Sequence, residues 1–222
     1  PLLTNITNKK RAILKNLIIA TDNGTQLYKY NKNRGHFRNI FAADIRKHMK
    51  VGKYNQIFRI LNSCIEEFDM RTMLKEKMGW TFTDEKWKGF KKNCIVKRRI
   101  GSKVTQVTLM VTGEDATPQQ KRKFHEEGGE EIRREYVRYI TKAFHAQGIE
   151  LSAKVSGLSS IDITLPGIDK GFGLTTIAKH LSIPLENMIF FGDAFHQGDN
   201  DEPSLKAVSK IVNFGNRVNI KK

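Results

Sequence analysis

The order of apolar segments toward the C-terminus places the strongest constraint on the fold. The segment GLTTIAKHLSI predicts a helix, because Leu174, Ile177 and Leu181 recur at helical spacing. Two short apolar runs follow, MIFF at 188–191 and VSKIVNF at 208–214, and each predicts a strand. Strands that alternate with helices favour a parallel sheet. Such sheets bind their ligands at the carboxyl ends of the strands, so chemistry is expected in the loop after MIFF.

That loop is rich in carboxylates. In GDAFHQGDND, Asp193 comes directly after the strand, and Asp199 and Asp201 follow six and eight residues later. Several hard oxygen ligands in one loop suit a Mg²⁺ ion. The alternative interpretation is a polar loop whose acidic side chains cap the next helix.

A lysine upstream of this loop adds a second element. In SSIDITLPGIDKGFGL, Lys170 stands at the start of the predicted helix, after a Pro-Gly turn. A fixed positive charge beside a site of carboxylates and metal is what a phosphoryl group needs. The alternative is a lysine that only faces solvent.

These two segments resemble a known family. SIDITLPGIDKGFGL and IFFGDAFHQGDND resemble the third motif, G-x-D-K, and the fourth motif, G-D followed by G-x-N-D, of the haloacid dehalogenase (HAD) superfamily. The similarity is strongest to the branch of sugar-phosphate phosphatases and phosphomannomutases, which carry an α+β cap between their second and third motifs. Upstream, RRIGSKVTQVTLMVTG and FHEEGGEEIRREYVRYI resemble a strand and a helix of that cap, less specifically.

The resemblance implies an α/β fold, an incomplete doubly wound parallel (Rossmann-like) core with an inserted α+β cap domain. Residues 1–39 and 156–222 are expected to belong to the core, and residues 40–155 to the cap. Within the cap region, NIFAADIRKHM (39–49), the segment 54–70 and the segment 130–147 are expected to be helical. In the last of these, Ile132, Tyr136, Ile140 and Phe144 recur at spacings of four. VTQVTLMV (104–111) is expected to form a strand, and ATPQQKRKFHEEGGEE (116–131) a polar loop. Residues 71–92 are basic, and their hydrophobic pattern is ambiguous between helix and strand.

The implied activity is Mg²⁺-dependent phosphoryl transfer through an aspartyl-phosphate, by a phosphatase or a mutase that acts on a phosphorylated small molecule, a sugar phosphate being favoured. By resemblance, Asp193 and Asp201 hold Mg²⁺ with Asn200 in support, and Lys170 neutralises the nucleophile and the phosphoryl group. Asp199 departs from the pattern, because relatives often have a second glycine there. The expected substrate contacts of the cap are Arg99, Ser160 and Asp162.

The first motif of the family is not found in this sequence. It requires Asp-x-Asp-Gly-Thr, and the only similar stretch, LIIATDNGTQLY, places Thr21 and Asn23 where the two aspartates belong. A hydroxyl without an activating base is a poor nucleophile, and an amide cannot transfer protons. Asp22 is expected on the wrong side of the strand, because side chains alternate. The stretch instead resembles the strand and Asn-Gly turn after the second motif. The nucleophile is therefore expected to be absent, and the chain to be inactive by itself.

Two other interpretations remain open. The chain could be a non-catalytic protein that binds phosphorylated ligands or nucleic acid, or one half of a split enzyme whose partner supplies the nucleophile. Residues 1–150 carry 31 basic and 16 acidic side chains, against 8 and 7 in residues 151–222, so the basic charge favours anionic ligands. Nucleic acid is not favoured, because aromatic residues do not alternate with the basic ones as stacking platforms would.

The remaining features indicate a cytoplasmic protein. No apolar run approaches the length of a membrane span, so no membrane association is expected. Cys64 and Cys94 lie thirty residues apart without a CxxC motif, which argues against a disulfide framework and for a reducing compartment.

Overall fold

The computed structural model describes residues 14, 17–192, 195 and 201–213. The described residues form two compact units. The terminal unit combines the N-terminal residues up to 43 with the described residues from 168 onward, and the middle unit consists of residues 44–167. The expected boundary at 155/156 therefore differs from the boundary at 167/168. The reason is that the strand after 155 is hydrogen-bonded within the sheet of the middle unit.

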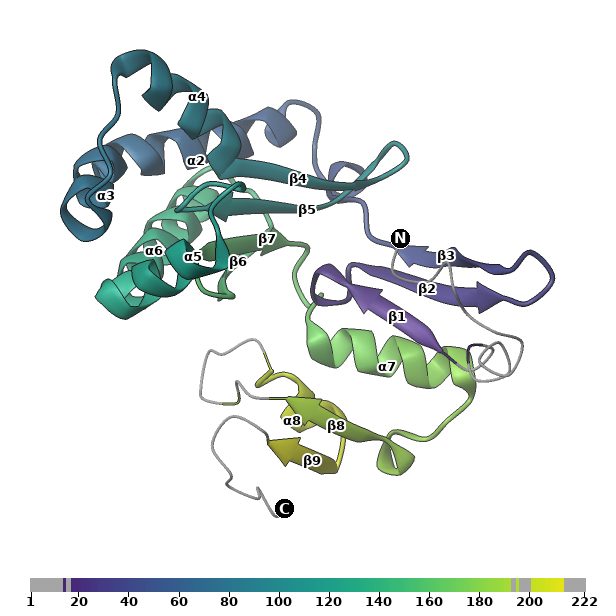
Figure 1. Ribbon diagram of the computed structural model, residues 1–222. Coiled ribbons are helices and arrows are strands. Elements are labelled where there is room, and N and C mark those ends of the chain that lie inside the picture. The colour runs from purple at the N-terminus through teal and green to yellow at the C-terminus, as the bar shows by residue number, and fades with distance from the viewer. Residues whose placement is uncertain (1–13, 15–16, 193–194, 196–200, 214–222) are drawn as a thin grey trace. The chain divides into compact units, whose positions relative to one another are not determined.

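The N-terminal part of the terminal unit is an antiparallel meander (Figure 1). It contains β1 (Ile18–Thr21), a 3-10 turn (Asp22–Gly24), β2 (Gln26–Asn31) and β3 (His36–Ala42). Consecutive strands joined by such short turns can pair only in antiparallel fashion.

The helix predicted over 39–49 is wrong. Its first half belongs to β3, which pairs with β2, and its second half is a 3-10 helix (Ile45–His48). The Asn39 side chain explains part of the difference, because its Nδ2 donates to the carbonyl oxygens of Leu27 and Phe41 at 3.1 and 2.7 Å. The bond to Leu27 holds the segment against β2, where the sequence pattern alone had indicated helical spacing.

The C-terminal part of the terminal unit contains the predicted helix and strands. They are α7 (Lys170–Leu181), a 3-10 turn (Leu185–Asn187), β8 (Ile189–Gly192), α8 (Ser204–Ala207) and β9 (Lys210–Asn213). β8 and β9 pair in parallel, which confirms the parallel arrangement predicted for this end of the chain. Among the described strands this is the one parallel pair, and the N-terminal strands are antiparallel instead.

The middle unit is built on a four-stranded antiparallel sheet with strand order β4-β5-β7-β6. Its strands are β4 (Ile95–Ile100), β5 (Lys103–Met110), β6 (Ser152–Ser156) and β7 (Ser160–Thr164). Its helices are α2 (Lys53–Glu67), α3 (Met70–Met78), α4 (Asp84–Cys94), α5 (Pro118–Phe124), a π-helical turn (His125–Gly129) and α6 (Glu130–Ala146). β5 and β8 lie in different sheets, as expected for a strand of an inserted domain and a strand of the core.

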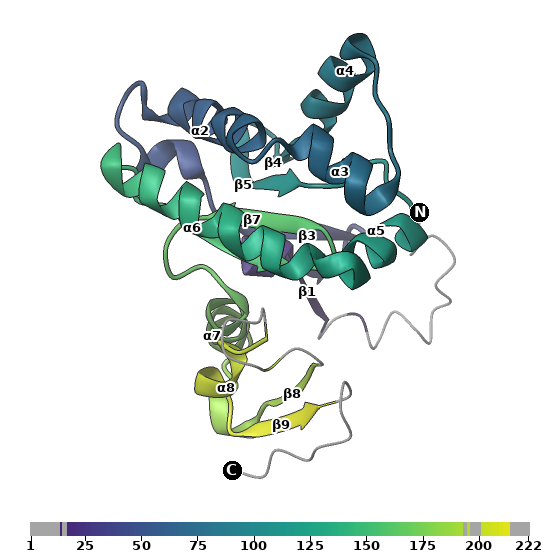
Figure 2. The same cartoon turned by 90° about the vertical axis from the view of Figure 1, so that its left-hand side faces the viewer.

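Helices α2 and α6 lie side by side over one face of this sheet (Figures 1 and 2). The buried side chains of α6 include Tyr136, Ile140 and Phe144, at the spacing of four residues that the sequence predicted. Strand residues such as Leu109 and Ile161 are completely buried as well. These apolar side chains belong to the core of the middle unit.

The loop predicted for 116–131 is also wrong, because α5 occupies part of it. The helix starts at a capping box, in which Thr117 Oγ1 accepts from the Gln120 amide and Gln120 Oε1 accepts from the Thr117 amide. Pro118 occupies the first helical position, where proline is favoured. This helix start is visible in the sequence as T-P-x-Q at 117–120. The polar composition of the segment had instead indicated a loop.

A buried arginine connects α6 to the turn between β6 and β7. Arg133 is 1% exposed, and its Nε donates to Gly129 O at 3.0 Å. Its Nη1 donates to the carbonyl oxygens of Ser156 and Gly157 at 3.0 and 2.9 Å. Burial lowers the pKa of the guanidinium to about 10, so it stays charged at neutral pH. Several backbone acceptors of the hairpin therefore depend on one side chain.

Replacing Arg133 with methionine is expected to destabilise the middle unit by about 3 kcal/mol, because the carbonyl groups stay buried without a donor. Trp80 and Trp87 both lie in the middle unit, so urea unfolding followed by tryptophan fluorescence measures its stability. Arg138→Met is the control, because the Arg138 side chain is 64% exposed and should cost less than about 0.5 kcal/mol. Equal losses in the two variants would contradict the role assigned to Arg133.

The two cysteines are expected to be unreactive in the folded protein. Cys64 and Cys94 are completely buried, and burial raises the pKa of each thiol from 9.0 to about 12. Three pKa units reduce the thiolate fraction at pH 8 about a thousandfold, so labelling by a disulfide reagent should be slow until urea unfolds the chain. Because the folded-state pKa is the higher one, this contribution to stability is complete below pH 9 and is lost as the pH rises toward 12. Rapid labelling of either thiol in the native chain at pH 8 would disprove this.

Candidate active site

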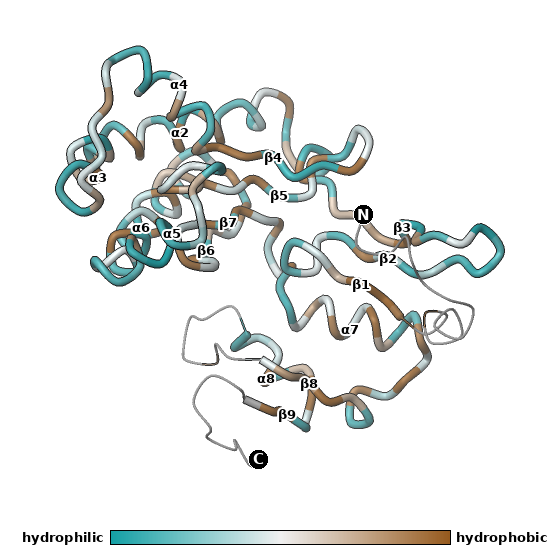
Figure 3. Tube along the Cα trace, in the orientation of Figure 1, coloured by the Kyte–Doolittle hydropathy of each residue, from teal (hydrophilic) through white to brown (hydrophobic). Residues whose placement is uncertain are grey.

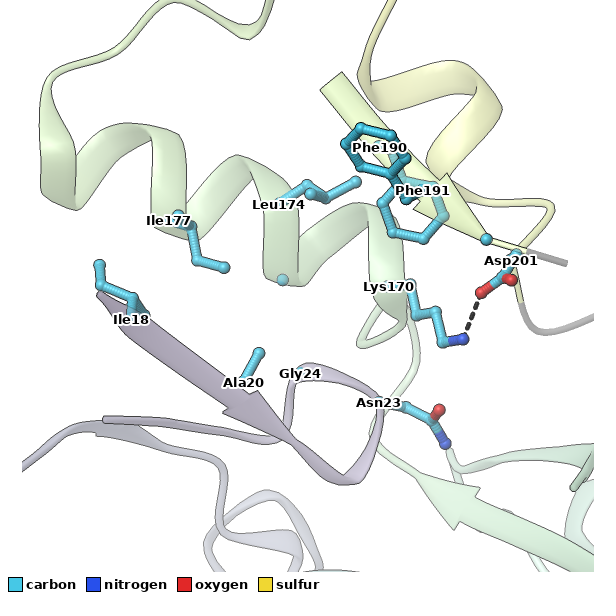
Figure 4. Close-up of a pocket in the computed structure, with 12 residues that line it drawn as sticks. Ile18, Ala20, Asn23, Gly24, Lys170, Leu174, Ile177, Phe190, Phe191 and Asp201 are labelled. Atoms are coloured by element: carbon cyan, nitrogen blue, oxygen red, sulfur yellow. Dashed lines mark hydrogen bonds and ion pairs between the residues drawn. The ribbon is translucent and has the colours of Figure 1, made fainter. Parts of the chain in front are cut away.

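A pocket of about 460 Å³ lies within the terminal unit. Its walls come from β1, the Asn23-Gly24 turn, α7 and β8, and Asp201 lies at one end (Figure 4). Apolar side chains from β1, α7 and β8 line most of it: Ile18, Ala20, Leu174, Ile177, Phe190 and Phe191. Polar and charged groups gather at the end where β8 stops, as expected for a site at the carboxyl end of a parallel strand.

Lys170 and Asp201 form an ion pair at that polar end. Lys170 Nζ donates to Asp201 Oδ1, and Figure 4 shows the two side chains directed toward each other. The Asp201 side chain is 2% exposed, whereas the Lys170 side chain is 31% exposed. The carboxylate is therefore buried behind an ammonium group that an anionic ligand can still reach.

The start of α7 fixes the position of Lys170. Asp169 caps the helix, because its Oδ1 accepts from the Phe172 amide at 3.0 Å. Lys170 is the first residue of the helix, and the cap orients it toward the end of β8. This explains the local structure of the G-x-D-K motif: its aspartate caps the helix whose first residue is the lysine.

Close approaches to two glycines, Gly192 and Gly171, bring Asp201 and the residues after it to this place. A Cβ atom on Gly192 would lie 2.5 Å from Asp201 Oδ2, and one on Gly171 would lie 2.7 Å from Pro203 O. The loop then continues into α8, where the Ser204 amide and hydroxyl donate to Asp201 O at 3.0 and 2.6 Å. Side chains at either glycine would push the carboxylate away from the lysine.

The Asn23-Gly24 turn packs against the first turn of α7. Gly24 has a φ of +88°, and a Cβ atom there would lie 3.1 Å from both Asp169 O and the Gly173 Cα. Glycine is required both by the left-handed conformation and by the close contact. Asn23 and Gly24 therefore line the pocket opposite Lys170 (Figure 4).

Asp22 has a local role in the same turn. Its Oδ2 accepts from Gln26 Nε2 at 2.9 Å, and Gln26 Oε1 accepts from the Tyr28 hydroxyl. Burial, and then the charge of Asp22, raise the pKa of Tyr28. Asp22 is not among the residues that line the pocket. Its position agrees with the expectation that this carboxylate does not face the site.

Part of the expected metal site cannot be placed. Asp193, Asp199 and Asn200 lie outside the described residues, and no group of three or more His, Cys, Asp or Glu side chains that could hold a metal occurs among the described ones. Asp201 supplies a buried carboxylate at the pocket, and Asp193 directly follows Gly192, which lines it. Hard oxygen donors of this kind fit Mg²⁺.

The three expected cap residues do not form one cluster. Arg99 pairs with Val104 near the start of β5, whereas Ser160 pairs with Met110 at its end. Six residues of strand separate the two positions, about 20 Å at 3.3 Å per residue. The Ser160 hydroxyl donates to Ser156 O at 2.7 Å and closes the β6–β7 hairpin. One small ligand cannot easily contact both ends of this strand.

Asp162 instead belongs to a buried polar row that the sequence reasoning missed. Thr108 Oγ1 donates to Asp162 Oδ1 at 2.9 Å and accepts from Gln106 Nε2 at 2.9 Å. Gln106 is a buried residue, only 3% exposed. Its Oε1 has no hydrogen-bond partner among the described residues. The available signal was the alternation of Gln106 and Thr108 with apolar residues in VTQVTLM, which places both on one face.

The family model of the haloacid dehalogenase-like hydrolases matches residues 4–219, nearly the whole sequence. The chain therefore belongs to the haloacid dehalogenase-like hydrolases, which confirms the resemblance drawn from the motifs. A search of curated proteins found no significant match.

Solved structures with a similar fold include two of the IMP-nucleotidase of Plasmodium falciparum. The N-terminally truncated enzyme is 17% identical with a TM-score of 0.51, and the match covers 93% of this chain and 48% of that one. An IMP-bound mutant of the same nucleotidase is 17% identical with a TM-score of 0.50, covering 91% and 46%. The chain thus spans about half the length of these structures, and the likeness concerns the fold alone.

The helices in the described part of the chain are not long and apolar enough for any of them to cross a membrane.

Substituting alanine for Gly171 is expected to destabilise the terminal unit by about 1–3 kcal/mol, because the Pro203 carbonyl must move away from α7. Gly89→Ala is a matched control, since Gly89 is also inside a helix and has no atom within 4 Å of the added Cβ. It should be neutral or stabilise α4 by up to about 1 kcal/mol. Hydrogen exchange followed by mass spectrometry separates the two units, and faster exchange of α7 in Gly89→Ala than in Gly171→Ala would refute the contact.

Proposed function

We propose that the chain carries the substrate-binding and metal-binding part of a Mg²⁺-dependent phosphatase that acts on a phosphorylated small molecule, a sugar phosphate being favoured. The observation that supports this most directly is the Lys170–Asp201 pair at the polar end of the pocket, where β8 stops. A positive charge held in place by a buried carboxylate suits the recognition of a phosphoryl group. Membership of a hydrolase family agrees with a reaction of this kind.

In this proposal the residues of the site divide into phosphoryl-binding and metal-binding groups, and Asp201 belongs to both. Lys170 binds the phosphoryl oxygens, and Asp201 orients the lysine through their ion pair. Asp193 and Asp201 would hold Mg²⁺, with Asn200 in support, and the bound ion would supply neutralisation of phosphoryl charge. Asn23 lies on the opposite wall, where its amide can donate to the substrate.

The nucleophile is proposed to come from polypeptide outside residues 1–222. Asp22 is engaged by Gln26 in the turn, and Thr21 and Asn23 lack the chemistry of a carboxylate nucleophile. The 222-residue chain is therefore expected to be inactive by itself, and activity is expected when an Asp-x-Asp-Gly-Thr segment is joined to its N-terminus.

The test is a screen of phosphate esters with the extended protein and with the 222-residue chain. The panel includes sugar phosphates and also IMP, because the similar structures include an IMP-bound nucleotidase. Asp193→Ala and Lys170→Ala in the extended protein should each lower kcat at least a hundredfold, since each removes charge that stabilises the transition state. Asp22→Asn should change kcat little, because Asp22 is held by Gln26 in the turn.

Two results would overturn the proposal. One is an extended protein that is folded and hydrolyses no ester of the panel. The other is Mg²⁺-dependent hydrolysis by the 222-residue chain that Asp22→Asn abolishes, because Asp22 would then be the nucleophile.

A further inference from the structure

The hairpin of β2 and β3 carries basic charge that the candidate active site does not use. Residues 26–43 contain no acidic side chain and four lysine and arginine side chains: Lys29, Lys32, Arg34 and Arg38. Three of the four are exposed, and Lys29 is half-buried. None of them forms an ion pair with another residue in the described part of the chain. Figure 3 shows the tip of the hairpin as hydrophilic.

Two of these cations lie opposite each other across the strands. Lys29 and Arg38 are partners in the antiparallel ladder, so both side chains project from the same face of the hairpin. Like charges at directly opposite positions repel each other and destabilise a sheet. Sequences tend to break a local rule of this kind at functional surfaces. An anionic partner removes the repulsion.

The tip of the hairpin is ordered by its own hydrogen bonds. Asn31 Oδ1 accepts from the amides of Asn33 and Arg34 at 3.0 and 3.2 Å. The Gly35 amide donates to Asn31 O at 2.9 Å, and Gly35 closes the turn with a φ of +68°. The basic side chains therefore project from a fixed backbone, so less ordering is needed when a partner binds.

Beyond Lys29 the hairpin is a ribbon of two strands. The described part of β1 pairs with β2 as far as the Ile18–Lys29 pair, and residues 30–37 lie past it (Figure 1). Four residues of each strand reach about 14 Å at 3.4 Å per residue. The major groove of B-DNA, about 12 Å wide and 8.5 Å deep, admits a two-stranded ribbon.

The surface of the hairpin favours duplex DNA over other polyanions. The large hydrophobic residues that are exposed in the described part of the chain lie outside 26–43, and stable membrane binding needs apolar side chains as well as charge. Single strands are held by aromatic rings on which bases stack. Tyr30 is buried and packs against Phe37 instead, with ring centroids 5.4 Å apart. Contacts to the phosphates of a duplex need only positive charge.

We propose that the β2–β3 hairpin is a docking element for duplex DNA, which it binds through the phosphate backbone without sequence preference. Lys32 and Arg34 enter the major groove with the tip, and Lys29 and Arg38 contact phosphates at its edge. The inference does not depend on the proposed function, because it requires neither the pocket nor a metal ion nor hydrolysis.

The test measures binding of the 222-residue chain to a fluorescent DNA duplex by anisotropy, between about 50 and 200 mM salt. One variant replaces all four cations of the hairpin with glutamine: Lys29→Gln, Lys32→Gln, Arg34→Gln and Arg38→Gln. It is expected to bind at least thirtyfold more weakly at about 100 mM salt, since four phosphate contacts are lost. The steepness of the logarithmic salt dependence should fall by about 3.6, at about 0.9 for each phosphate.

A charge-matched control separates the hairpin from the net charge of the chain. Helices α3 and α4 carry four exposed lysines that form no ion pair with a described residue: Lys75, Lys77, Lys86 and Lys88. Glutamine at these four positions removes the same charge from the middle unit. Affinity for the duplex should change less than about threefold, because the hairpin is intact.

A single variant excludes unfolding as the cause of lost binding. Arg38→Glu places opposite charges across the ladder at Lys29, which favours the folded hairpin. Hydrogen exchange of the β2 and β3 amides should be no faster than in the native chain. The same variant should bind the duplex at least tenfold more weakly, because a phosphate contact is replaced by a repulsion.

The inference is overturned if the native chain does not bind the duplex at low salt, or if the hairpin variant and the control variant lose the same affinity. Native-like binding by Arg38→Glu also overturns it. So does hairpin-dependent binding of single-stranded DNA or of anionic phospholipid vesicles that is at least as tight as binding of the duplex.

Discussion

The contact between the Asn23-Gly24 turn and the first turn of α7 is the constraint on which the candidate site depends. It joins segments of the chain that are almost 150 residues apart in sequence, and it tolerates no side chain at Gly24. Because Asp169 caps α7 at the same point, the contact fixes the residue that follows, Lys170. The N-terminal meander therefore acts as one wall of a pocket whose chemistry comes from the C-terminal segments.

The ion pair at this pocket has an asymmetric burial that suits a binding site better than a purely structural role. A pair buried on both sides usually contributes little net stability, since desolvation offsets the attraction. Here Asp201 is buried and Lys170 is partly accessible, so the carboxylate holds the lysine and leaves its charge available to a ligand. The close approach of Gly192 to Asp201 links the pair to the end of β8.

The middle unit is stabilised by its own interactions. α2 and α6 cover an apolar sheet face, and Arg133 satisfies the backbone acceptors of the β6–β7 hairpin. The other face of the sheet carries the row of Gln106, Thr108 and Asp162. These buried side chains are hydrogen-bonded to one another. Within this row, Gln106 Oε1 has no hydrogen-bond partner among the described residues.

Sequence alone determined the elements whose hydrophobic period is unambiguous and the motifs whose spacing is specific. The stripe of Tyr136, Ile140 and Phe144 predicted α6, and the order of helix and strands predicted the parallel pair of β8 and β9. The G-x-D-K and G-D motifs pointed to Lys170 and the following loop, and to a family that the family model then confirmed. These signals depend only on residues close together in the sequence, so they can be recognised without knowledge of the fold.

Tertiary structure decided the features that depend on which segments meet. Residues 39–42 form a strand because β2 offers hydrogen bonds to them, which no local pattern records. Arg99 of β4 and Ser160 of β7 pair with residues near opposite ends of β5, because strand register sets the distance between residues along a sheet. The pairing of Lys170 with Asp201 depends on close contacts at Gly171, with the Pro203 carbonyl, and at Gly192, with the Asp201 carboxylate. Sequence spacing specifies what each residue can do, whereas packing between distant segments decides which residues act together.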